Sequence, residues 1–560
     1  MHYCGRSTLF FLALNGVMLL VVGCGSETND KTNPPSSVTA ESPKVTNSPA
    51  PENSTPKDPA STSAESTAPA LPDSTNKTET EAASTPASSP PKPLLKDWPA
   101  PKLAMLITGE IHGYFEPCGC TENQSGGMSR RADLIEKMQE MGWTVTGLDL
   151  GGTLKRNRRQ DQLKYETVLA SLTEMRYSVV GIGPEELRFG PDAFLQLHNP
   201  APENPDTTPS LVSANIIMLE TPDLGKFPSK VVTLNGVKLG VTSILGKDQR
   251  DQVIGATTSG DLKIEEAQAA LPAVIASLKE QNPDLLVLLS HASKDESKAL
   301  AEKFPEFDLI VTAGGAEEPN GVPQKVGKTM IVDVGHKGKH AGVVGYYPDQ
   351  GDDKFRFELV ELDRRFADNQ KMIEQMRFYQ ERLRLEKLAY SEPALPHESG
   401  ARFVGAEKCG ECHTKAYEKW KTTKHAQATD SITHSRKGQP EYGITRIYDP
   451  ECLCCHSTGW NPQEVIRYEG GFVNEEFAQS DEEKSLAKLL QGQQCENCHG
   501  PGSKHIELAE AGDIDGAKKL THLDIATAKE NVCYKCHDFD NSPHFEFKKY
   551  WKEIAHPWRD

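Results

Sequence analysis

The stretch Cys495-Glu496-Asn497-Cys498-His499 contains the pattern Cys-x-x-Cys-His, which occurs four times in the last third of the chain. In this pattern two thiols add to the vinyl groups of a haem, and the histidine binds the iron. Four copies predict four c-type haems; the alternative is a zinc array, which does not need histidine at the same place every time. The predicted attachment residues are Cys409, Cys412, Cys452, Cys455, Cys495, Cys498, Cys533 and Cys536, and the predicted proximal iron ligands are His413, His456, His499 and His537.

Histidine is also the expected second iron ligand, because the chain has no methionine after Met376. Bis-histidine irons, and hence lower potentials, are the consequence. His425 lies 12 residues after His413, on an expected helix over 416–428. At ~1.5 Å rise per residue the two are about 18 Å apart, so His425 should serve a neighbouring haem. The candidates for the second ligand are His425, His505, His556 and His544.

The region around these motifs, residues 400–560, resembles the tetrahaem cytochrome c-554 family. The resemblance rests on Phe403-Val404-Gly405 before the first motif, on Trp420 and the His425-Ala426 pair, on the glycine-proline turn before His505, and on Tyr550-Trp551 with His556. It implies a mostly helical fold with stacked haem pairs and bis-histidine irons, often with one five-coordinate haem. It also implies electron transfer.

The middle of the chain has a different pattern, in which short apolar runs alternate with helical stretches. This alternation predicts an α/β layered domain with a largely parallel or mixed sheet. A charged helix over 368–389 and a proline-bearing stretch over 391–400 are expected to lead out of it. The expected strands are 103–107, 143–148, 178–182, 211–217, 285–289, 309–311 and 330–334, and the expected helices include 129–141, 162–176 and 262–281.

Glycine-rich loops after several of these strands resemble the 5′-nucleotidase (UshA-like) branch of the calcineurin-like metallophosphatases. The resemblance implies a phosphatase fold whose loops bind two metals that activate water for phosphoester cleavage. The segments that carry it include 109–113, 126–131, 148–152, 183–190, 213–216, 289–291 and 308–315.

The same loops depart from the family pattern. Glu110 stands where the first aspartate is expected, Gly152 replaces the bridging aspartate, and Glu185 lies where a histidine is expected, although His112 and His291 are retained. These residues are too few for a two-metal site. The fold is therefore expected to persist without the hydrolase activity.

A Cys-x-Cys pair, Cys118 and Cys120, follows His112 in the chain. Such a pair forms a small disulfide of high potential or donates two thiolates to a soft metal. Glu110, His112 and His291 are candidates to complete such a redox or additional metal site. The alternative in an exported chain is a plain disulfide or two buried thiols.

The amino terminus has the form of an export signal. Arg6 precedes an apolar run over 9–22, and small residues lead to Cys24, as in the lipobox of bacterial lipoproteins. Lipidation of Cys24 would anchor the chain at the periplasmic side of a bacterial membrane; the alternative is ordinary secretion. The expected organisation is a signal peptide over 1–23, a Ser/Thr/Pro-rich tether over 24–98, the α/β domain over 99–366, a linking helix and boundary over 367–399, and the tetrahaem domain over 400–560.

The net charge of −18 argues against nucleic acid as a partner, because the chain has 80 acidic residues and only 62 basic ones. We therefore expect periplasmic electron-donor and electron-acceptor proteins as partners, with the α/β domain as a docking or accessory redox module. One alternative is an oxidoreductase that acts on a small nitrogen or sulfur compound at a five-coordinate haem. The other is a metal-dependent phosphoesterase retained in the α/β domain.

Overall fold

The computed structural model describes residues 93–117, 124–197, 209–219, 226–256, 260–434 and 444–556. Residues Ala87–Asp560 form one compact unit. Within the described residues we distinguish an α/β region, up to residue 366, from a haem-motif region that begins at residue 400. Among the described residues, no helix is both long and apolar enough to cross a membrane.

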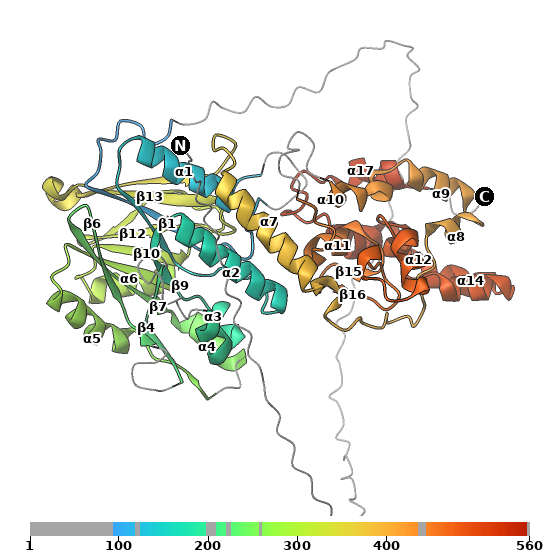
Figure 1. Cartoon of the computed structure of the whole chain (residues 1–560), viewed down its shortest axis with the longest axis horizontal. Helices are drawn as coiled ribbons and strands as arrows, with labels where there is room; N and C mark the ends of the chain where they lie inside the picture. Colours follow the sequence, from blue (N-terminus) through green and yellow to red (C-terminus); the bar gives the residue numbers. More distant parts are fainter. Residues whose placement is uncertain are drawn as a thin grey trace, which may run out of the picture. The chain divides into compact units, whose positions relative to one another are not determined.

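Two mixed β-sheets form the centre of the α/β region (Figure 1). The first has the order β14-β13-β1-β2-β3-β4-β5, with β8 beside β4; its strands are β1 (Leu103–Thr108), β2 (Val145–Asp149), β3 (Tyr177–Gly181), β4 (Ser210–Met218), β5 (Lys226–Phe227), β8 (Leu262–Ile264), β13 (His340–Tyr346) and β14 (Phe355–Glu361). The second has the order β11-β12-β10-β9-β7-β6; its strands are β6 (Lys230–Leu234), β7 (Val237–Leu245), β9 (Leu285–Ser293), β10 (Leu309–Gly314), β11 (Gln324–Val326) and β12 (Thr329–Asp333).

Along each central strand, successive side chains enter two different hydrophobic cores, one on each face of the sheet. In β1, Leu103, Met105 and Ile107 belong to the core between the sheets, whereas Ala104 and Leu106 belong to the core beneath the outer helices. All five are fully buried. Successive side chains of a strand point to opposite faces, so a run of apolar residues gives a strand that is covered on both sides. The sequence therefore predicts a sheet buried on both faces.

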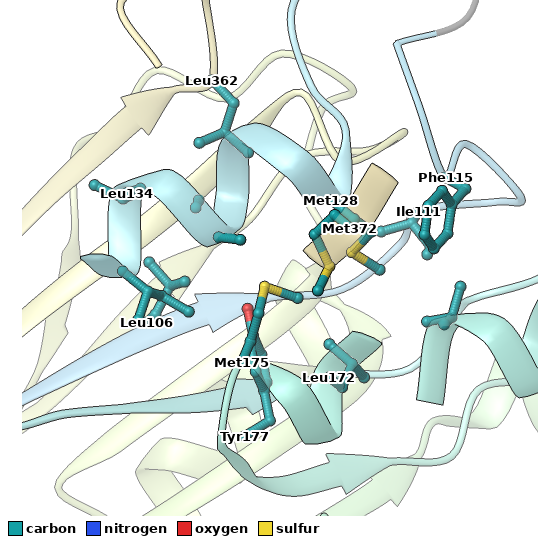
Figure 2. Close-up of a cluster of buried hydrophobic side chains, with 14 of the residues drawn as sticks. Leu106, Ile111, Phe115, Met128, Leu134, Leu172, Met175, Tyr177, Leu362 and Met372 are labelled. Atoms are coloured by element: carbon teal, nitrogen blue, oxygen red, sulfur yellow. The ribbon is translucent and has the colours of Figure 1, made fainter. Parts of the chain in front are cut away.

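Helices cover the outer faces of both sheets. On the first sheet, Leu134, Leu172 and Met372 from three helices pack with Leu106 and Tyr177 in one cluster (Figure 2). The helices here are α1 (Met128–Glu140), α2 (Arg159–Glu174) and α7 (Gln370–Leu385); the second sheet is covered by α5 (Ala267–Glu280) and α6 (Lys294–Lys303), and α3 (Pro191–Leu197) and α4 (Lys247–Ala256) are shorter helices elsewhere in the region.

Two sequence-based boundaries differ from the structure. Residues 262–264 form β8 rather than the start of a helix, because Ile264 pairs with Ile216 of β4 before α5 begins. The expected tether is also too long at its end. Leu95 lies in the core, 4% exposed, and Trp98 stacks on Trp143 with ring centres 6.2 Å apart. The α/β region therefore includes residues before 99.

The haem-motif region is mostly helical, as expected, with β15 (Trp460–Asn461) and β16 (Ile466–Arg467) as one short pair. Its main apolar cluster is small and includes Phe403, Leu453, Trp460 and Leu490. The helices are α8 (Ala406–Gly410), α9 (Thr414–Lys421), α10 (Asp430–Thr433), α11 (Pro450–His456), α12 (Asp481–Leu489), α13 (Cys495–His499), α14 (Ser503–Glu510), α15 (Ile514–Thr521), α16 (Ile525–Thr527) and α17 (Phe547–Ile554), with the short turns η4 (Lys424–Gln427) and η8 (Cys533–Lys535).

Candidate functional sites

Each Cys-x-x-Cys-His motif lies in or at the end of a helical turn. In the first, the His413 amide donates to the Cys409 carbonyl (3.0 Å), and in the fourth, the His537 amide donates to the Cys533 carbonyl (2.9 Å). This i to i+4 bond brings the first cysteine and the histidine to the same side of the backbone. None of the eight motif cysteines, nor Cys454, forms a disulfide with another described residue. The geometry suits attachment to a planar group.

Six histidines form three facing pairs, and each pair joins a motif histidine to one outside the motifs. An iron held at ~2 Å by an imidazole nitrogen on each side separates the ring centres by about 6 Å. The observed separations match that span. They are 6.1 Å for His413 and His505, 6.0 Å for His537 and His425, and 5.9 Å for His499 and His556.

Hydrogen bonds orient several of these rings. His499 Nδ1 lies 2.8 Å from the Thr521 carbonyl oxygen, and His505 Nδ1 lies 2.9 Å from that of Ala517. A carbonyl oxygen only accepts, so each Nδ1 carries the hydrogen and Nε2 keeps its lone pair for a metal. His456 Nδ1 has the same relation to the Ala428 carbonyl, at 2.9 Å.

Partial burial favours the neutral form of three of these rings. Desolvation is the main reason that the pKa values of His425, His499 and His537 are lowered. A neutral imidazole is the form that binds iron. Helices α9, α14 and α17 also bury none of their own residues. Their apolar side chains are thus available to cover a porphyrin, and the described residues fit c-type haem.

Three of the four distal candidates face a histidine of a particular motif. His425 faces the fourth motif and not the first, which agrees with the spacing argument. The expected helix over 416–428 is broken, however, because Thr423 is extended between α9 and η4. His544 instead lines a cavity of about 260 Å³ with Lys337, His340 and Phe539 among its other walls.

A second polar cluster lies at the carboxyl ends of the α/β strands, the usual place for a site in such folds. Glu110 follows β1; its Oε2 lies 3.0 Å from His112 Nε2, and its Oε1 lies 3.1 Å from His291 Nε2. The backbones of Glu110 and His112 have positive φ values of 52° and 47°. Residues other than glycine rarely adopt this backbone conformation, so the loop is strained at Glu110 and His112.

The departures from the phosphatase pattern are coupled in space. A Cβ atom added at Gly152 would lie 2.1 Å from Glu110 Oε1. The Glu110 side chain, which is longer than the expected aspartate, therefore fills the space that an aspartate at position 152 would need. Among the described residues, no group of three or more His, Cys, Asp or Glu side chains is arranged to hold a metal ion. The cluster therefore does not fit the two-metal site. Cys118 and Cys120 lie outside the described residues.

Sequence reasoning missed two members of this cluster. Glu186 is 1% exposed and accepts hydrogen bonds from the amides of Thr153 (2.6 Å) and Gly183 (2.9 Å). Burial, and after it the neighbouring Glu185 charge, raise the pKa of Glu186 to about 7. His336 stacks on His112 with ring centres 5.4 Å apart. It follows β12 at the same sheet edge, so strand order would have pointed to it.

Helix α11, which carries the second motif, is tied to the α/β region. Its N-cap, Asp449, accepts hydrogen bonds from Gln160 of α2 (2.8 Å) and Gln380 of α7 (2.7 Å). Lys164 of α2 pairs with Glu451 at 2.6 Å, and the Lys164 side chain is 6% exposed. Burial of a charge is costly unless it is paired, so this seam holds the motif in one place.

A second link follows the fourth motif. Asp540 accepts hydrogen bonds from Tyr114 Oη (2.8 Å) and Lys337 Nζ (2.6 Å), while its carbonyl accepts one from Gln124 (2.6 Å). The Lys337 amide in turn donates to the Glu110 carbonyl. Hydrogen bonds therefore join the polar cluster to the segment that follows the fourth motif.

Comparison with known proteins separates the chain into the same two regions. Residues 408–500 match the family model of cytochrome c554 and c-prime. Cytochrome c-554 from Nitrosomonas europaea is 28% identical over 174 residues, which are 28% of this chain and 64% of the relative. The carboxyl-terminal region is thus similar to multihaem cytochromes c, a family that implies covalently bound haem iron and electron transfer.

The α/β region is similar to nucleotidases. The NAD 5′-nucleotidase of Haemophilus influenzae is 27% identical over 228 residues, or 38% of this chain and 36% of the relative, and an apyrase of Aedes aegypti is 25% identical over 228 residues, or 38% and 39%. A 5′-nucleotidase precursor structure from Thermus thermophilus aligns at 16% identity with a TM-score of 0.44, covering 59% of this chain and 66% of that one. The chain spans less than two thirds of each of these relatives.

Proposed function

We propose that this protein transfers electrons through four covalently bound c-type haems outside the cytoplasm, with the α/β region as a docking or accessory redox module. The facing histidine pairs are the observation that carries the proposal. Each pair takes its two members from different parts of the region, so iron binding would tie distant segments together. The haems, when bound, supply one-electron carriers; the chain positions and orients their ligands.

Particular residues perform that positioning. The carbonyls of Thr521 and Ala517 hold His499 and His505 in the tautomer that presents Nε2. Two imidazoles at one iron would bind both of its oxidation states with little rearrangement, which suits an electron carrier. The Asp449 cap and the Lys164–Glu451 pair hold the second motif against the α/β region.

The proposal is tested on purified, full-length protein made with haem maturation. Haem staining, iron analysis and oxidised and reduced spectra are expected to give four haems per chain with mainly low-spin bands. Fewer than four haems would contradict it. A high-spin band that shifts when a small nitrogen or sulfur compound is added would instead favour the oxidoreductase. Metal-dependent nucleotide cleavage would favour the phosphoesterase.

Lipid anchoring through Cys24 belongs to the same proposal and rests on the sequence alone, since Cys24 lies outside the described residues. Cells grown with a labelled fatty acid are expected to label the wild-type protein in the membrane fraction. The Cys24→Ser variant should lose the label while keeping its haems. A wild-type protein without label would leave ordinary secretion as the explanation.

A further inference from the structure

Two helices of the haem-motif region are rich in lysine, although the chain as a whole has a net charge of −18. The segment from α9 to the end of η4, Thr414–Gln427, contains four lysines and one glutamate. Helix α17, Phe547–Ile554, contains three lysines and one glutamate. We call these two segments the lysine helices; both lie in the orange-to-red part of Figure 1.

The charges of the lysine helices face solvent. Lys421, Lys424, Lys548, Lys549 and Lys552 are all exposed. Lys421 pairs with Glu418 of its own helix at 2.6 Å. Within the described part of the chain, no carboxylate lies at ion-pair distance from the other four. Their positive charge is therefore available to an external partner.

Ring contacts join both lysine helices to one haem position. His425, directly after Lys424, faces His537 of the fourth motif. His537 stacks on Phe545 with ring centres 4.4 Å apart and planes at 9°, and Phe545 stacks on Tyr550 of α17 at 5.6 Å and 6°. Lys549 Nζ lies 5.2 Å from the Tyr550 ring centre. A packed row of rings thus leads from an iron ligand to a basic surface.

We propose that the lysine helices form the docking surface for an acidic redox protein that exchanges electrons with the haem held by His425 and His537. This inference rests on the proposed electron-transfer function. In the exchange, one electron leaves the partner's cofactor and reduces ferric to ferrous iron, with no bond made or broken. Positive charge steers an acidic partner to this surface, and the ring row brings its cofactor close to the iron.

Local charge favours a compact acidic protein over an anionic membrane surface. A membrane or a nucleic acid presents negative charge to a large part of the protein, most of which is acidic here. A small partner meets only the lysine helices. Electrostatic steering of this kind acts over about 30 Å at 0.01 M ionic strength but only about 8 Å at 0.15 M. Strong salt dependence is therefore expected.

The experiment uses the full-length holoprotein and flavodoxin hydroquinone, an acidic one-electron donor, as the probe. The test variant carries Lys424→Gln, Lys548→Gln, Lys549→Gln and Lys552→Gln. The control variant changes charge equally at exposed lysines elsewhere, with Lys298→Gln, Lys303→Gln, Lys518→Gln and Lys519→Gln. Binding of oxidised flavodoxin and the rate of haem reduction are measured at low and at physiological ionic strength.

At low ionic strength the test variant is expected to lose about tenfold in affinity and in second-order rate, together with most of the salt dependence, whereas the control changes less than about twofold. Equal losses of affinity and rate in both variants would show that only the net charge of the protein matters, and would overturn the proposal. Binding to anionic vesicles that only the test variant loses, with flavodoxin binding unchanged, would assign the surface to membranes. Reduction by dithionite distinguishes failure of the docking proposal from failure of the proposed electron-transfer function. If dithionite reduces the haems equally in all three proteins, the electron-transfer function stands whatever the result with flavodoxin.

Discussion

The α/β region and the haem-motif region obtain their cores in different ways. In the α/β region, entire strands such as β1, β9 and β10 are lined with buried aliphatic residues from their first position. In the haem-motif region the main apolar cluster, around Leu453 and Leu490, is smaller, and α9, α14 and α17 bury none of their own residues. The first region is stabilised by its own side chains, and we expect the second to depend on a cofactor that covers its helices.

The largest expected effect comes from removing that cofactor. In a variant with serine at all eight motif cysteines, the haem-motif region should lose protection from proteolysis, because its helices lack apolar partners. The α/β region should keep its resistant fragment, since its cores are complete. Limited proteolysis with mass spectrometry locates the cut sites. Protection of α9, α14 and α17 without haem would show that the two regions do not differ in this respect.

Breaking the seam between the regions should have the next largest effect. Lys164→Met removes the buried cation beside Asp449 and leaves Glu451 paired with Arg156 alone, so it is expected to lower the free energy of unfolding by about 3 kcal/mol. Lys371→Met, which breaks an exposed pair with Glu174, is the matched control and should change it by less than about 0.5 kcal/mol. Urea unfolding followed by haem absorbance and by tryptophan fluorescence measures both. Coincident transitions would mean that the regions unfold as one unit, and equal effects of the two variants would contradict the role of the seam.

A smaller effect is expected at the altered phosphatase loop. Gly152→Ala places a Cβ atom against Glu110 Oε1 at a φ of +71° and should cost about 2–3 kcal/mol. Gly142→Ala, at a φ of +80° with nothing within 4 Å, isolates the backbone part and should cost about 1 kcal/mol.

The double variant Glu110→Asp/Gly152→Ala tests the coupling directly. A shorter carboxylate withdraws from the new Cβ atom, so thermal unfolding should show that the double variant recovers about 1 kcal/mol relative to additive costs. Additive costs would mean that Glu110 does not fill the space beside Gly152.

The smallest expected effect is a pH dependence confined to the α/β region. Burial raises the pKa of Glu186 from 4.5 to about 7, so the folded protein keeps this proton where the unfolded chain releases it. Stability should therefore fall as pH rises from about 4.5 to about 7, because across this range the unfolded chain releases the proton and the folded protein keeps it. Thermal unfolding across this range measures the slope. Glu186→Gln should flatten it whatever its effect on overall stability, and an unchanged slope would assign the dependence to another group.

The two regions also differ in how far the sequence predicted their sites. Regular Cys-x-x-Cys-His spacing is a local property, so all four motifs were visible without a fold. Apolar runs also predicted many of the buried strands, because apolar periodicity reports burial directly, but β7, β13 and β14 were not among the expected strands. The start of α5 was misplaced, since the short β8 strand before it depends on pairing with β4, a partner nearly fifty residues earlier in the chain. Glu186 and His336 escaped notice for a related reason: each is ordinary in its local sequence and acquires a role only where strand ends converge.

The sequence by itself determined the chemistry of this protein: four haem motifs, histidine in place of methionine, an α/β layered region and loops that had lost the residues of a two-metal site. Tertiary structure decided which histidine faces which motif, because the facing pairs join segments up to 112 residues apart, as for His425 and His537. It also decided that Glu110 fills the space beside Gly152 and that Asp449 and Asp540 bind the two regions to each other. The spacing of the haem motifs is a property of the sequence. The pairing of histidines and the fit of Glu110 beside Gly152 depend on distances that exist only after folding.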